Sequence, residues 1–143
     1  EHVSPMGGVS RALRCGDRDA SRRNSARIND IESDMHNRYP PRNDQTRERG
    51  AYPFREVPGE RLVERGCDLD IDHQARVVEP RPASRGNIAR AMLYMADRYD
   101  LEIYSRQRRL LLEWHRTDPV DDAERERNRT IARIQGRSNH WIE

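Results

Sequence analysis

The most regular pattern in the sequence is Asn87-Ile88-Ala89-Arg90-Ala91-Met92-Leu93-Tyr94-Met95-Ala96-Asp97-Arg98-Tyr99. Its large apolar residues recur at Ile88, Met92, Met95 and Tyr99. This i, i+4, i+7, i+11 spacing places them on one face of an α-helix. The pattern therefore predicts an amphipathic helix over residues 87–99, with Met92 and Met95 packed in the core.

Two further helices are predicted downstream of this stretch. Ser105 can cap a helix that runs through residues 110–112 to Trp114. Asp118-Pro119 combines a capping residue with a proline at the first helical position, and acidic residues follow, which the positive end of a helix favours. This third helix is expected to end at Gly136. The carboxyl-terminal part is therefore expected to form a cluster of about three helices.

One strand region is predicted ahead of these helices. Cys67, Leu69 and Ile71 alternate with aspartates, which is the two-residue period of a half-buried strand. Val77 and Val78 extend this strand until the prolines that follow end it. Together with the helices, the pattern predicts the α+β class.

Composition limits the class of protein. The chain has 143 residues, which fit one domain with a single core. Its 27 basic residues are all arginine, although the formal net charge is only +2. Arginine binds phosphate in a bidentate fashion, so local patches of it favour polyanion binding, but GC-rich codon usage explains an all-arginine chain equally well. No apolar run is long enough to cross a membrane, and no signal peptide is visible.

The first residues, Glu1-His2-Val3-Ser4-Pro5-Met6, set a carboxylate beside an imidazole. A carboxylate is a hard oxygen ligand for Mg²⁺, and a neutral imidazole can take a proton from water near pH 7. The pair therefore suits metal-assisted hydrolysis of a phosphodiester. Taken alone, the same dipeptide is also typical of a solvated, frayed chain end.

A long loop rich in arginine follows, over residues 6–28. Its positive charge can receive a nucleic-acid backbone, although a purely solvated loop would have the same composition. Cys15 in this loop and Cys67 allow either one disulfide or two reduced thiols.

Several runs of residues match a known pattern in order and spacing. They are Glu1-His2-Val3-Ser4-Pro5, Glu32-Ser33-Asp34-Met35-His36-Asn37, Glu79-Pro80-Arg81-Pro82, Arg85-Gly86-Asn87-Ile88-Ala89-Arg90-Ala91-Met92, Tyr94-Met95, Trp114, Asp118-Pro119-Val120, Glu124-Arg125 and Gln135-Gly136. Together they resemble the bacterial endonuclease I family, which comprises periplasmic or secreted, largely sequence-non-specific nucleases with a ββα-metal (His-Me) finger. The resemblance implies a single endonuclease I-like domain over residues 1–143, with the finger strands at residues 1–5 and 32–37.

The resemblance also implies the roles of individual residues. His2 stands at the position of the general base, and Glu1 at that of a metal ligand. Arg22 stands at the phosphate-stabilising arginine, with Arg23 as the adjacent candidate. Thr46 takes the place of the metal-binding Asn, within a segment over residues 42–49 that fits a short helix. A Thr hydroxyl can coordinate Mg²⁺, but its shorter side chain is expected to weaken the site.

The implied function is a Mg²⁺-dependent endonuclease, with other divalent cations as substitutes. It would hydrolyse DNA, with RNA as an alternative substrate, through arginine–phosphate contacts in the periplasm or outside the cell. Because Thr46 departs from the family pattern, the alternative is a catalytically weakened relative that binds nucleic acid or serves in an assembly. Family members also carry a segment before Glu1, so either a missing amino-terminal piece or a protein partner is expected to complete the fold.

The remaining histidines and tryptophans are predicted to be structural. His36 and Asn37 are assigned structural roles, with His36 expected to pack beside the finger and metal binding as its alternative. Trp114 and Trp141 are assigned to packing, with stacking on a base as the alternative for Trp141. The histidines with no partner identifiable from sequence are assigned to the surface or the core: His73, His115 and His140.

Overall fold

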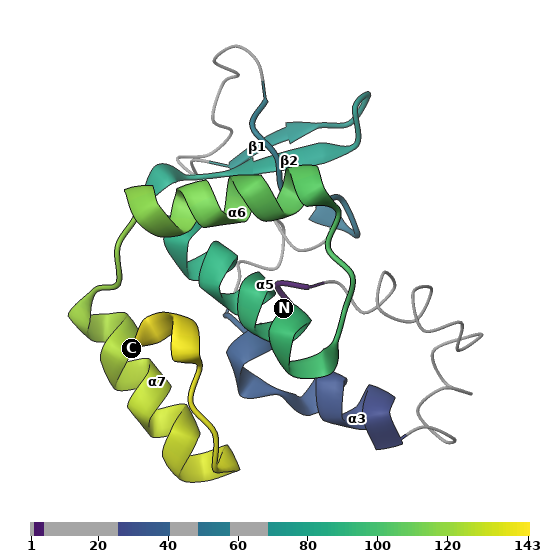
Figure 1. Cartoon of the computed structure of the whole chain (residues 1–143). Coiled ribbons are helices and arrows are strands. Elements are labelled where there is room, and N and C mark those ends of the chain that lie inside the picture. The colour runs from purple at the N-terminus through teal and green to yellow at the C-terminus, as the bar shows by residue number, and fades with distance from the viewer. Residues whose placement is uncertain (1, 5–25, 41–48, 58–68) are drawn as a thin grey trace.

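The computed structural model describes residues 2–4, 26–40, 49–57 and 69–143 (Figure 1). Their elements follow in the order α3 (Ala26–Ser33), η1 (Met35–Asn37), β1 (Leu69–Asp72), β2 (Val77–Pro80), η3 (Pro82–Ser84), α5 (Arg85–Tyr99), α6 (Ser105–Thr117), α7 (Asp122–Gln135) and η4 (His140–Ile142). The η elements are short 3₁₀ turns. The predicted α+β class is confirmed, whereas residues 42–48 of the predicted short helix and the pair Cys15 and Cys67 lie outside the described residues.

The helix predicted over residues 87–99 is α5, which lies in the middle of the molecule with α6 crossing it (Figure 1). Met95 and Tyr99 are buried as predicted, and Met92 is partly buried against the core. Alanines between the larger residues let neighbouring segments approach closely, so burial extends beyond the single predicted face. The helix ends at Asp100, which adopts a left-handed backbone with φ of 49°.

The predicted cap of the second helix is wrong by one residue. Ser105 is the first residue of α6, and Tyr104 is the N-cap, without a side-chain hydrogen bond. Tyr104 takes this place because its backbone carbonyl already accepts the first helical bond, from the N–H of Arg108 at 3.0 Å.

The predicted start of the third helix is also wrong. The N-cap of α7 is Asp121, whose side chain accepts the backbone N–H of Glu124 at 2.7 Å. Asp118 instead ends α6, and its Oδ2 accepts the backbone N–H of Gly86 at 2.8 Å, which ties the end of α6 to the start of α5. The predicted stop at Gly136 is confirmed, since this residue has the positive φ of 75° that favours glycine.

The predicted single strand region is in fact a hairpin, in which β1 and β2 pair antiparallel with Asp72 opposite Val77. The Oδ1 atom of Asp72 accepts the backbone N–H of Ala75 at 2.8 Å, and Arg76 has a φ of 55°. These features reverse the chain, so Val77 and Val78 return alongside β1 instead of extending it. Local alternation locates strands but does not show where the chain turns back.

The segment predicted as the second finger strand is helical. It spans the end of α3 and the turn η1, because Oδ1 of Asp34 accepts the backbone N–H of His36 at 2.9 Å and closes a 3₁₀ turn. Beside residues 2–4, the described chain shows an isolated antiparallel bridge between His2 and Arg38 in place of a ladder. Of the strand pairing that the resemblance implies for the finger, the described residues thus show one bridged pair.

Two buried hydrophobic clusters hold these elements together. The first joins Val3, Phe54 and Val78 to α5 and α6, and it contains Trp114, which is 1% exposed as its predicted packing role requires. The second packs the isoleucines of α3 against the aromatic side of α5, and Trp141 packs against both clusters. Since Val3 belongs to the main core, the residues around His2 are anchored to α5.

Candidate active site

The backbone around His2 is fixed by Asn37. Val3 donates its N–H to the backbone oxygen of Asn37 at 2.9 Å, and Ser4 donates its N–H to Oδ1 of the same residue at 2.7 Å. The amide group of Asn37 donates in return to the backbone oxygen of Ser4 at 3.3 Å. Asn37 is fully buried, and a hydrogen bond in such a low-dielectric place is electrostatically stronger than in water. The predicted structural role of Asn37 is confirmed.

Arg49 holds the same short segment from another direction. Its guanidinium donates to the backbone oxygen of His2 at 3.2 Å and to that of Val3 at 2.8 Å. The side chain is only 4% exposed, and its guanidinium carbon lies 4.1 Å from the centre of the Phe54 ring. A buried planar cation that binds two neighbouring carbonyls restricts both the position and the direction of the chain at His2.

The imidazole of His2 is oriented by a backbone oxygen. Its Nε2 atom lies 3.0 Å from the oxygen of Glu32, at the end of α3. A carbonyl oxygen can only accept, so Nε2 carries the proton, and in the neutral ring the basic lone pair is on Nδ1. Arg38 donates to the same oxygen through Nε and Nη2, at 3.1 and 2.9 Å, which places a guanidinium beside the imidazole.

The buried carboxylate of Asp34 stabilises the turn η1, which carries Asn37. Asp34 is 3% exposed, and its Oδ2 atom accepts the hydroxyls of Tyr94 at 3.1 Å and Tyr99 at 2.8 Å. Its Oδ1 atom accepts the side-chain amide of Gln135 at 3.2 Å in addition to the N–H that closes η1. Burial and the neighbouring carboxylate raise the pKa of Tyr94 to about 12, so the phenol stays protonated and donates. This network joins α3, α5 and α7 beneath the candidate site.

His36 packs as predicted and does not face the site. Its ring lies edge-on to Tyr94 with the centroids 4.7 Å apart, and Nε2 donates to the backbone oxygen of Arg137 at 3.0 Å. Burial lowers the pKa of His36 below its usual value of 6.5, which keeps the ring neutral.

The other histidines and Trp141 have partners that the sequence did not reveal. His140 and Trp141 both reach Asp97, with Nε2 at 3.3 Å and Nε1 at 2.9 Å from its Oδ2 atom. His115 lies beside the buried guanidinium of Arg90, with Nδ1 and Nη1 3.5 Å apart. His73 is exposed on the hairpin turn, as expected for a surface histidine.

Of the four predicted site residues, the structure describes His2, and it leaves Glu1, Arg22 and Thr46 outside the described residues. Sequence reasoning missed Arg38 and Arg49 as neighbours of His2. In a chain with 27 basic residues, no local signal separates a buried arginine from an exposed one. The available signal for Arg49 was its place in the run Asp44-Gln45-Thr46-Arg47-Glu48-Arg49, which resembles a family motif ending in arginine.

Comparison with known proteins gives this geometry a context. The family model described as Endonuclease I matches residues 1–143. The chain belongs to the endonuclease I family. The match begins at residue 1, so the Glu1-His2 pair lies within the part that the endonuclease I model covers.

Named relatives agree with this membership. A periplasmic deoxyribonuclease of Aeromonas hydrophila is 37% identical over the whole chain, which covers 62% of that protein. An extracellular deoxyribonuclease of the same species is also 37% identical over the whole chain, which covers 64% of it. An extracellular ribonuclease of Bacillus subtilis (strain 168) is 39% identical over 46% of this chain and 29% of its own length. The chain thus spans less than two thirds of the two deoxyribonucleases. None of the helices in the described ranges is long and apolar enough to cross a membrane.

Proposed function

We propose that this chain hydrolyses phosphodiester bonds in nucleic acid, with His2 as the general base. The observation that carries the proposal is the contact of 3.0 Å between Nε2 of His2 and the backbone oxygen of Glu32. This contact assigns the proton to Nε2, so the basic lone pair of the neutral ring is on Nδ1, the atom proposed to take a proton from water. A base acts well when its orientation is fixed before the substrate arrives, and Asn37 and Arg49 supply that restraint through the backbone of residues 2–4.

In the proposed reaction, Nδ1 of His2 takes a proton from water as the oxygen of that water attacks phosphorus, and the bond from phosphorus to the leaving oxygen of the strand breaks. The guanidinium of Arg22 is proposed to stabilise the negative charge that develops on the phosphate oxygens. Arg38, held by the same carbonyl oxygen that orients His2, adds positive charge beside the base.

The proposed metal ligands are Glu1 and Thr46, whose carboxylate and hydroxyl oxygens are hard donors of the kind that Mg²⁺ prefers. Among the described residues, no group of three His, Cys, Asp or Glu side chains is placed to hold a metal. Glu1 directly precedes His2, and Thr46 stands three positions before Arg49, which donates to the backbone oxygen of His2. That contact supports placing both ligands at one site. A divalent cation there supplies Lewis acidity that stabilises charge on the phosphate and the leaving oxygen.

The substrate and location are proposed from the relatives. Two of them are named deoxyribonucleases and one a ribonuclease, and their names place them in the periplasm or outside the cell. We therefore propose DNA as the main substrate, RNA as a second one, and a periplasmic or extracellular location. Recognition is expected to run through phosphates, because the chain supplies its positive charge as arginine.

Digestion of plasmid DNA and of structured RNA by the purified protein tests the proposal. Each substrate is incubated with Mg²⁺, with Mg²⁺ plus excess chelator, and without added metal. Cleavage that needs the metal and stops with the chelator supports the nuclease. Gel shifts without any metal-dependent cutting at high protein concentration would instead favour the weakened, nucleic-acid-binding relative.

A further inference from the structure

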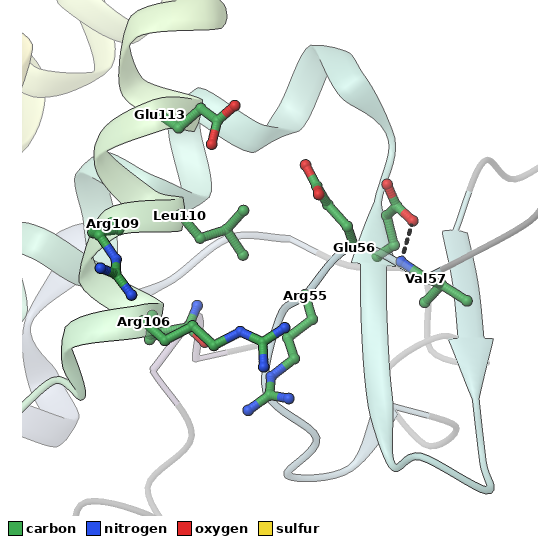
Figure 2. Close-up of a pocket in the computed structure, with 9 residues that line it drawn as sticks. Arg55, Glu56, Val57, Arg106, Arg109, Leu110 and Glu113 are labelled. Atoms are coloured by element: carbon green, nitrogen blue, oxygen red, sulfur yellow. Dashed lines mark hydrogen bonds between the residues drawn. The ribbon is translucent and has the colours of Figure 1, made fainter.

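A pocket of about 630 Å³ lies on the surface between residues 55–57 and one side of α6 (Figure 2). Three arginines line it: Arg55, Arg106 and Arg109. None of the three guanidinium groups makes a hydrogen bond, an ion pair or a ring contact with the described residues, whereas exposed arginines of α7 pair with neighbouring carboxylates. The pocket therefore gathers three arginines whose charges no ion pair with a described residue compensates.

The charges in the pocket are separated. Figure 2 shows the guanidinium groups of Arg55 and Arg106 extending toward one another at one end, while the carboxylates of Glu56 and Glu113 lie away from them. The third carboxylate, Glu79, is already engaged, because it accepts the backbone N–H of Val57 at 2.6 Å and pairs with an arginine outside the pocket at 2.5 Å. Two like charges that face each other without a counter-charge attract an anion between them.

The first turn of α6 adds donors to the same end of the pocket. Arg106 and Gln107 both line it, and they are the second and third residues of the helix. The N-cap Tyr104 makes no side-chain hydrogen bond to this turn, so its side chain leaves the first N–H groups of α6 uncapped. The Nε2 atom of Gln107 is buried and has no hydrogen-bond partner among the described residues. An uncapped helix start with unused amide donors favours a phosphate oxygen.

We propose that this end of the pocket binds a backbone phosphate of the nucleic-acid strand, away from the site of cleavage. The inference rests on the proposed function and extends its substrate contacts. A strand fits better than a small free anion that fills the pocket, because Glu56 and Glu113 would repel such an anion at the far end.

The pocket is close enough to His2 for one nucleic-acid strand to contact both. Residues 49–57 connect them, since Arg49 binds the backbone oxygen of His2 and Arg55 follows six positions later. Six residues span at most about 20 Å, which corresponds to roughly six base steps of duplex rise.

Binding to an uncut labelled 20-base-pair duplex in chelator tests the site directly, by anisotropy over a series of salt concentrations. The double variant Arg55→Ala/Arg106→Ala should bind about fivefold to tenfold more weakly at low salt, and the slope of log affinity against log salt should fall by about 1. Arg116→Ala is the matched control, because Arg116 is also an exposed α6 arginine without a described ion pair and lies outside the pocket. Glu113→Gln should tighten binding about twofold, since it removes a repulsive charge.

The outcomes distinguish failure of the proposed phosphate site from failure of the proposed nuclease function. If the double variant binds the duplex as the Arg116→Ala variant does, the phosphate site is refuted, even where the parent cleaves DNA. If inorganic phosphate binds the parent and not the double variant while duplex affinity is unchanged, the pocket takes small anions and the proposal also fails. If the parent never cleaves DNA but the double variant shows the predicted loss of affinity and of salt slope, the phosphate site is supported. Only the proposed nuclease activity is then contradicted. Thermal unfolding of each variant should match the parent, because all the substituted side chains are exposed.

Discussion

The imidazole of His2 donates from Nε2 to the backbone oxygen of Glu32, 3.0 Å away and 30 positions along the chain. The acceptor is a main-chain atom at the end of α3, so the orientation of the candidate base depends on the helix and not on the chemical type of one side chain. Arg49 binds the backbone oxygen of His2 itself, and Asn37 fixes the backbone of the next two residues, Val3 and Ser4. Three separate parts of the chain thus determine the position and orientation of the His2 imidazole.

The first prediction concerns the base itself. His2→Ala should lower the rate of DNA cleavage by about 10²-fold to 10⁴-fold, which is the usual contribution of a general base, while affinity for uncut DNA changes little. His73→Ala is the matched control, because His73 is exposed on the hairpin turn. Cleavage by the His2 variant at the parental rate would show that another group takes the proton.

Arg49 is expected to act as a positioning residue. Arg49→Lys keeps the charge but loses the planar fork that binds the carbonyls of His2 and Val3, so unfolding should become easier by about 1.5–3 kcal/mol. At a temperature where circular dichroism shows a folded variant, kcat should fall with little change in KM. A purely structural role predicts instead that the folded fraction keeps its parental kcat.

Thr46 gives a prediction about metal affinity. Thr46→Asn would restore the amide ligand implied by the family resemblance, so half-maximal cleavage should need less Mg²⁺ than in the parent. Titration of Mg²⁺ against the initial cleavage rate of both proteins measures the difference. An unchanged or higher Mg²⁺ requirement in the Asn variant would remove Thr46 from the ligand set.

A buried ion pair between helices should dominate the stability of the carboxyl-terminal part. Arg90 binds Glu124 through two contacts of 2.9 and 2.5 Å, and the two side chains are 0% and 2% exposed. Arg90→Ala would leave a buried carboxylate without its partner, at an expected cost of about 3–5 kcal/mol in unfolding free energy. Arg129→Ala breaks an exposed pair that water and salt screen, so its loss should be much smaller. Urea unfolding of both variants measures the contrast, and equal losses would contradict it.

His36 should make folding stability depend on pH. Burial lowers the pKa of His36 below 6.5, so on acidification the unfolded chain takes up a proton before the folded chain does. The free energy of unfolding should therefore fall as the pH drops below about 6.5, by at most about 1.4 kcal/mol per pH unit for this group. His36→Gln should flatten the profile between pH 7.5 and 5.5, measured by urea unfolding. The exposed His73→Gln variant should keep the parental slope, and the same flattening in both would assign the effect elsewhere.

Much of the helical part could be predicted from local patterns. The apolar spacing from Ile88 to Tyr99 and the glycine at residue 136 are local signals that packing did not overrule. The errors fell at boundaries, where Ser105, Asp118 and Asp121 were all capable of capping and backbone geometry decided among them. The hairpin was missed for a related reason, because the turn between β1 and β2 has no glycine and depends on Asp72 and on the positive φ of Arg76.

The sequence by itself determined the α+β class, the amphipathic character of α5 and the resemblance to endonuclease I, because these depend on residue types at fixed spacing. Only the tertiary structure decided how His2 is held, since Glu32 and Arg49 contact it across 30 and 47 positions, and Asn37 contacts the nearby Ser4 across 33 positions, each bond using a backbone atom. Every residue has a backbone carbonyl, so no residue type in the sequence marks the one that will orient a base. The sequence also did not reveal the pocket arginines that have no ion pair among the described residues, because the fold decides which charged side chains come together.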